Sequence, residues 1–257
     1  MIRGLWDRET IALTLLAAML PMGASWLIAG GLEAAGRLLF FLVVAGIWHV
    51  LWMLARAQPP SFAGALTALA IAMLAPEDLG LFALLLGTSF GVVMAELAFG
   101  GWGRNVLNPA TIALAFLGFS YPAAPWPELP VQLGWAAWPA AAIGVVFGVT
   151  SLRLLAGAAL GFAAAMLAGL DLTAVWTGAL VALMLLVCDP VASAATGLGR
   201  WLNGLLYALL IALFAVFWDT AAPVQAAVSA ALLTSLAAPL LDEFAIALWL
   251  ARRKRLG

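Results

Sequence analysis

The 257-residue chain is 66% hydrophobic and only 9% charged, with a formal net charge of −1 and a mean hydropathy of +1.13. Soluble domains are close to half apolar and a quarter charged, so this composition predicts a polytopic membrane protein. The net charge argues against nucleic-acid binding, and one cysteine with one histidine argues against an intramolecular disulfide and a zinc or haem ligand set. We expect no metal site, and redox chemistry would need an organic cofactor.

Apolar runs predict ten membrane-spanning helices, because roughly 20 apolar residues cross a bilayer and broken helices need fewer. In chain order the segments are 10–29, 38–55, 62–75, 80–99, 109–121, 134–150, 153–170, 173–188, 201–218 and 224–250. The first run lacks a small-residue cleavage site, so we interpret it as a spanning helix and not a signal peptide. His49 lies inside the second segment, where we expect it to pack against its neighbours rather than relay protons. Residues 1–257 then form a single transmembrane domain.

Basic residues orient these segments. With ten helices, all but one of them fall on the same side, which should be cytoplasmic together with both chain termini. On that side lie Arg3, Arg8, Arg56, Arg104, Arg153, Arg200, Arg252, Arg253, Lys254 and Arg255. Arg37 alone lies opposite.

An internal repeat divides the chain into two halves. A shift of 114 residues aligns GALTALAIAMLAP (Gly64–Pro76) with GALVALMLLVCDP (Gly178–Pro190) and Pro109 with Pro223. Each half holds five helices, and an odd number means that the halves are inverted across the membrane. Such repeats build a site near the membrane interior from short or broken helices, here segments three, five, eight and ten. The repeats cover about 10–121 and about 134–250.

The glycine loop, GGWGRNVLNPA (Gly100–Ala110), is polar where its surroundings are apolar. Its glycines let backbone N–H groups approach a ligand closely, and asparagine amides suit the edge of a planar heterocycle. Asn108 is also a typical helix N-cap before Pro109, and Arg104 on its own would be a cytoplasmic anchor. Trp102 is either a stacking platform or an interfacial aromatic. The candidate ligand-binding residues of this loop are Gly101, Trp102, Gly103, Arg104, Asn105, Asn108 and Pro109.

A second polar cluster, CDPVASAATGLGRW (Cys188–Trp201), follows the eighth segment. Asp189 closes an apolar run, so it is either a helix end at the interface or a partner for Arg104, Arg200 or a cofactor. Counting the predicted helices places Asp189 on the same side of the membrane as the asparagines of the glycine loop, which is consistent with one shared site. The candidate binding residues of this cluster are Asp189, Ser193 and Thr196.

Three ordered motifs resemble one known family. GGWGRNVLNPATIALAFLGFSYP, DPVASAATGLGRWLNG and APLLDEF (Ala238–Phe244) are similar to motifs of the NqrB/RnfD family. Its members are membrane subunits of the sodium-pumping NADH:quinone reductase and of the Rnf ferredoxin:NAD complex. The resemblance implies a urea-transporter-like fold, the bacterial inner (plasma) membrane, and partner membrane and periplasmic redox subunits. It also implies a non-covalent flavin, riboflavin or FMN, beside Gly103, Arg104, Asn105 and Asn108.

Two departures from the family pattern concern its cofactors. The family attaches FMN to the threonine of an S-x-A-T segment, whereas residues 123–133 here contain neither serine nor threonine. We therefore expect no covalent FMN. The family's carboxylate at the start of helix three corresponds to Ala63, which argues against quinone binding and ion coupling. A quinone is thus only an alternative cofactor.

Through this resemblance we expect an electron-transfer subunit of an Rnf- or Nqr-like redox complex, not catalytic on its own, that relays electrons across the bilayer. We assign no catalytic residue to it. The first alternative is a channel or transporter for a small polar solute, which would need a continuous polar lumen. The second is a cofactor-free scaffold subunit, in which the asparagines of the glycine loop serve assembly alone.

Overall fold

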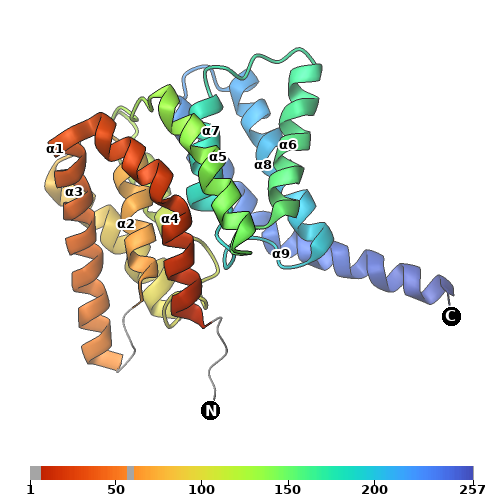
Figure 1. Ribbon diagram of the computed structural model, residues 1–257, viewed down its shortest axis with the longest axis horizontal. Helices are drawn as coiled ribbons and strands as arrows, with labels where there is room; N and C mark the ends of the chain where they lie inside the picture. Colours follow the sequence, from red (N-terminus) through yellow and green to blue (C-terminus); the bar gives the residue numbers. More distant parts are fainter. Residues whose placement is uncertain (1–6, 57–60, 257) are drawn as a thin grey trace.

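The computed structural model describes residues 7–56 and 61–256, and within these ranges the chain forms helices and loops but no strand (Figure 1). The first half forms α1 (Arg8–Arg56), α2 (Ala63–Leu74), α3 (Leu81–Phe90), the π-helical turn η1 (Gly91–Glu96), the 3-10 turn η2 (Leu97–Phe99) and α4 (Pro109–Ser120). The second half forms α5 (Val131–Val146), α6 (Leu152–Leu167), α7 (Trp176–Ala182), the π-helical turn η3 (Leu183–Val187), α8 (Gly197–Phe217) and α9 (Pro223–Leu256). The predicted all-α class is confirmed.

The long helix α1 consists of two arms joined at Gly31. There the backbone leaves the helical conformation, with φ 56° and ψ −135°, a geometry that glycine adopts without a steric penalty. Figure 1 shows the first arm running up to the bend and the second arm running back down from it. The arms match the predicted segments 10–29 and 38–55, and the bend brings both ends of α1 to the same side.

The other predicted segments are helical too, and three of the four expected short helices are short. The helices α2 and α4 have 12 residues each, and α7 with η3 runs over Trp176–Val187. The fourth differs from the prediction, since α9 continues for 34 residues through Pro239. Its sequence is rich in alanine and leucine and contains no glycine that would end the helix.

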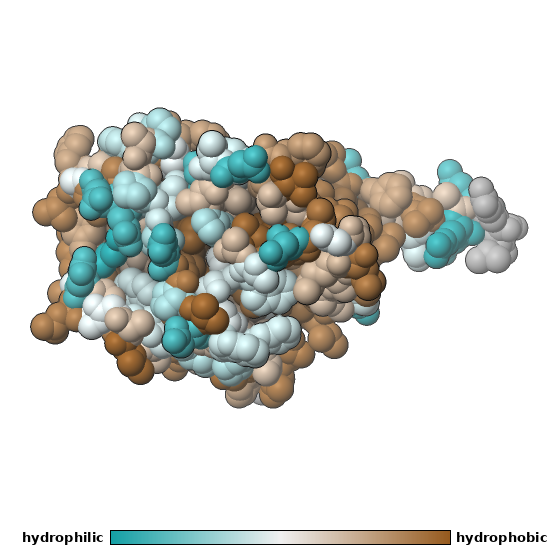
Figure 2. Space-filling model, turned by 90° about the horizontal axis from the view of Figure 1, so that it is seen from above, coloured by the Kyte–Doolittle hydropathy of each residue, from teal (hydrophilic) through white to brown (hydrophobic). Residues whose placement is uncertain are grey.

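Within the described ranges, four helical stretches are long and apolar enough to cross a bilayer: Arg8–Arg56, Leu81–Phe99, Gly197–Phe217 and Pro223–Lys254. Large apolar side chains are exposed within the helices, for example Ile47 in α1, Leu160 in α6 and Leu209 in α8. Figure 2 shows polar residues gathered over the end face seen from above, with apolar residues around its rim. An apolar belt with polar ends is the distribution expected of a multi-pass membrane protein.

The short helix α2 lies inside the bundle, where it packs on α1, α4 and η3. Ten of its 12 residues are buried. The Arg37 guanidinium, from the second arm of α1, donates hydrogen bonds to the carbonyls of Ala75 and Pro76 at the end of α2. The carbonyls at a buried helix end need such donors. Arg37 therefore has a structural role at the end of α2, whichever side of the membrane it lies on.

Candidate functional site

The glycine loop turns the chain back from η2 into α4, and its glycines make that turn. Gly100, Gly101 and Gly103 have φ of 103°, 91° and 93°, a left-handed backbone that other residues rarely adopt. The Gly101 N–H donates to the Glu96 carbonyl over 3.1 Å. The Arg8 guanidinium donates to the Trp102 carbonyl over 3.1 Å, so the start of α1 holds the loop in place.

Asn105 and Asn108 are both buried, but their side chains have different partners. Asn105 stays within the loop, accepting from the Gly103 N–H over 3.0 Å and donating to the Leu107 carbonyl over 3.1 Å. Asn108 accepts from the Thr111 N–H over 3.1 Å, which makes it the N-cap of α4, with Pro109 as the first helical residue. The capping role considered for Asn108 is therefore confirmed.

Asn108 also joins the two polar clusters. Its amide donates to Asp189 Oδ2 over 2.9 Å, and Asp189 Oδ1 accepts from the Val191 N–H over 3.0 Å. Asp189 lies in the connection between η3 and α8 and is almost fully buried. Burial raises the pKa of its carboxyl, and the bonds from Val191 and Asn108 oppose that shift. Its partner is an amide of the glycine loop and neither of the arginines considered from the sequence.

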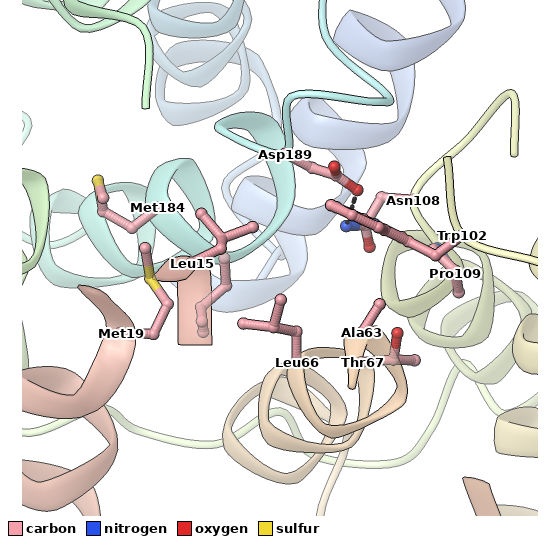
Figure 3. A pocket seen from close by; sticks show the side chains of 11 residues that line it. Leu15, Met19, Ala63, Leu66, Thr67, Trp102, Asn108, Pro109, Met184 and Asp189 are labelled. Atoms are coloured by element: carbon pink, nitrogen blue, oxygen red, sulfur yellow. Dashed lines mark hydrogen bonds between the residues drawn. The ribbon is translucent and has the colours of Figure 1, made fainter. Parts of the chain in front are cut away.

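Asn108 and Asp189 border a small cavity, which we call the Asn108 cavity (Figure 3). Its volume is about 20 Å³, enough for one water molecule. The polar atoms of Asn108 and Asp189 lie at one end beside the buried indole of Trp102, and apolar side chains close the other end. The apolar lining includes Leu15, Met19, Leu66 and Met184.

Pro109 also lines this cavity, whereas the remaining predicted site residues are not part of its lining. Gly103 and Arg104 are exposed on the outer side of the loop, and Ser193 is half-buried. Thr196 caps α8 by accepting from the Gly199 N–H over 3.0 Å. It also donates from its hydroxyl to Asp242 Oδ1 over 2.6 Å. The second cluster is thus divided, because Asp189 faces the glycine loop while Thr196 is bound to α9.

Two carboxylates at these sites were missed by the sequence reasoning. Asp242 accepts hydrogen bonds from the backbone N–H groups of Ala195 and Thr196, both 2.8 Å long, and so fixes the start of α8. Glu96, at the end of η1, is completely buried below the glycine loop. Its position in an apolar predicted segment was the available signal, because ionisable residues within spanning segments are usually functional.

The comparisons with known proteins agree with the motifs. The NQR2, RnfD, RnfE family matches residues 2–155, which is more than half of the chain. The chain therefore belongs to this family of membrane proteins.

Its relatives include proteins named as a subunit of the Na(+)-translocating NADH-quinone reductase. The protein of Stutzerimonas stutzeri is 28% identical over 82% of this chain, and that of Neisseria meningitidis serogroup B is 29% identical over the same share. The Klebsiella pneumoniae protein is 28% identical over 84% of this chain. The chain spans 66% of the length of the first two relatives and 67% of the third.

Proposed function

We propose that this chain is a membrane electron-transfer subunit of an Nqr- or Rnf-type redox complex, carrying one non-covalent flavin and working with other redox subunits. The observation that carries the proposal is the hydrogen bond between Asn108 and Asp189. It joins, at one cavity, the two motifs by which the chain resembles the family. The subunit lies in the bacterial inner membrane with both termini in the cytoplasm.

The proposed topology is ten spans in two inverted repeats within a single transmembrane domain. Ten helical segments follow one another in the described ranges when the two arms of α1 are counted separately. Pro109 and Pro223, which the repeat aligns, are each the first residue of a helix. The helices α2 and Trp176–Val187, which the repeat also aligns, are both short and largely buried. These correspondences support an inverted repeat.

The residues present fit a flavin in chemistry but not in volume. Asn108 and Trp102 offer an amide and an aromatic face, which suit the edge and the plane of a heterocycle. A cavity of about 20 Å³ holds a water molecule and not a three-ring system. Binding at this place therefore requires the cavity to enlarge, because Trp102 and the apolar side chains around it fill the space.

A flavin bound there would supply the electron-transfer chemistry. The protein's own part is positional. Asn108 holds Asp189 in place, Asp189 fixes the turn after η3 through Val191, and Arg8 holds the backbone of Trp102. These bonds would hold the two loops beside the flavin in position.

The test is purification of the chain alone and with its complex, followed by flavin absorbance and the mass of the released molecule. Acid denaturation should release the flavin entirely, because no covalent anchor is expected. The variant N108A should lose most of the bound flavin, whereas R153A, on a different helix, should keep it. Colourless protein in every complex would contradict the proposal.

A second candidate is a cofactor-free scaffold subunit. It is favoured by the small cavity and by the asparagine amides, whose hydrogen bonds are all made within the protein. In that case N105A and N108A would change the assembly of the complex but leave electron transfer per assembled complex unchanged. Electron-transfer rates normalised to the amount of assembled complex separate the two functions.

A further inference from the structure

A second buried polar pair lies below the glycine loop, outside the Asn108 cavity. His49 comes from the second arm of α1, and Glu96 ends the π-helical turn η1. His49 Nε2 and Glu96 Oε1 are 3.6 Å apart. Glu96 has no exposed surface, and the His49 residue is 8% exposed. The two side chains therefore face each other in the interior of a largely apolar bundle.

Neither side chain of this pair is satisfied by the residues that the structure describes. Both carboxyl oxygens of Glu96 and the Nε2 atom of His49 lack a hydrogen-bond partner. The backbone N–H of Trp102 lies near the Glu96 carboxyl without completing such a bond. Buried polar groups are nearly always paired, and ionisable ones within a membrane protein are costly. A buried acid and a buried base that face each other without hydrogen-bond partners indicate a binding site for a very small ligand.

The packing around His49 leaves room only for a small ligand. A Cβ atom on Gly64, at the start of α2, would lie 2.7 Å from His49 Nε2. Glycine at this position therefore lets the imidazole reach Glu96. A π-helical turn such as the one that ends at Glu96 is a distortion found most often at functional sites.

Three charged groups act electrostatically on the pair, and each of them is bound to another partner. Arg8 donates to Glu9 and to the Trp102 carbonyl, and Glu9 accepts from the Phe62 N–H over 3.0 Å. Asp189 is bound to Asn108. The fields of Arg8, Glu9 and Asp189 reach Glu96, and those of Arg8 and Glu9 reach His49. The Glu9 side chain is 27% exposed, so one of the charges that act on the pair borders solvent.

We propose that His49 and Glu96 form a proton-binding site that holds one proton between the imidazole and the carboxylate. A carboxylate and a neutral imidazole carry a net charge of −1, and one bound proton makes the pair neutral. That proton forms a bond to Nε2 or to Oε1, and the O–H bond of the hydronium ion that delivers it breaks, leaving water. In a buried position the neutral, singly protonated pair is favoured over both the unprotonated form and the doubly protonated form, because each of these carries a net charge. The site exchanges its proton with solvent near Glu9, and it stands whether or not a flavin binds.

The first test uses the unaltered protein, because His49 is the only histidine in the chain. Labelling with ¹⁵N-histidine of the purified protein in lipid nanodiscs gives one imidazole to follow by NMR. Infrared difference spectra of the same sample, between about pH 5 and pH 9, report protonated carboxyl groups. We expect the His49 signals and a buried carboxyl band to change over the same pH range. A pH-independent His49 signal, or one that changes with sodium and not with pH, would overturn the proposal.

The second test compares two substitutions of a carboxyl group. E96Q should remove the buried carboxyl band and move the midpoint of the His49 titration by about one pH unit or more. E128Q, in an exposed loop, should leave both unchanged. If E96Q keeps the band and the midpoint, the carboxyl group that titrates is not Glu96 and the proposal is wrong.

Discussion

Two buried polar pairs lie beneath the same glycine loop, and they are built in opposite ways. In the pair of Asn108 and Asp189, every side-chain nitrogen and oxygen has a hydrogen-bond partner. In the pair of His49 and Glu96, the facing nitrogen and both carboxyl oxygens have none among the described residues. A satisfied buried pair stabilises a fold, whereas an unsatisfied one lowers stability and persists where another function uses it. The first pair therefore holds two loops together, and the second serves a ligand.

The largest expected effect comes from breaking the satisfied pair. N108A removes the cap of α4 and leaves a buried carboxylate oxygen of Asp189 unpaired. We expect the free energy of unfolding to fall by about 2–4 kcal/mol, from the loss of a charged hydrogen bond and a cap. Thermal unfolding in detergent measures it. N105A is the matched control, since Asn105 bonds only within its own loop, and it should cost about 1 kcal/mol. Equal losses would contradict the assigned role of Asp189.

A smaller effect is expected from pushing the unsatisfied pair apart. G64A places a methyl group 2.7 Å from His49 Nε2, so the imidazole must rotate away from Glu96. We expect a loss of about 1–2 kcal/mol, typical of overpacking in a core. The single histidine signal should shift in NMR spectra. The control is G46A, in the same arm of α1 as His49, because a Cβ there has open space around it. A histidine signal unchanged by G64A would contradict the observed packing.

Replacing the Glu96 carboxyl by an amide should change the free energy of unfolding in the opposite direction. E96Q replaces a buried ionisable group by an amide of similar shape, which removes a cost of burial. We expect stability to stay the same or to rise by about 1–2 kcal/mol, because the amide is neutral in this buried position without binding a proton. Thermal unfolding at neutral pH measures the change. Destabilisation as large as that of N108A would mean that Glu96 is a structural group and that the two pairs do not differ.

The sequence predicted much of this framework because it depends on local signals. The lengths of the apolar runs predicted the helices, and Asn108 before Pro109 predicted the cap. Counting the helices predicted that Asp189 lies on the same side as the glycine loop. The partners of Thr196 and Glu96 were not predictable in this way. Asp242 lies 46 residues from Thr196 along the chain. The contact between Glu96 and His49 depends on which faces α1 and η1 turn toward each other. Neither contact leaves a periodic pattern, since each depends on how helices pack in three dimensions.

The smallest effect is expected at the exposed side of the glycine loop. Arg104 is exposed and makes no side-chain hydrogen bond to the residues that the structure describes, unlike Arg8, which binds the Trp102 carbonyl. R104A should therefore change the free energy of unfolding by less than about 0.5 kcal/mol, as is usual for surface positions. Its melting temperature should match that of the unaltered protein, while R8A should melt earlier. If R104A melts as early as N108A, the arginine is part of the packed loop, and the contrast between a satisfied interior and an open outer face no longer holds.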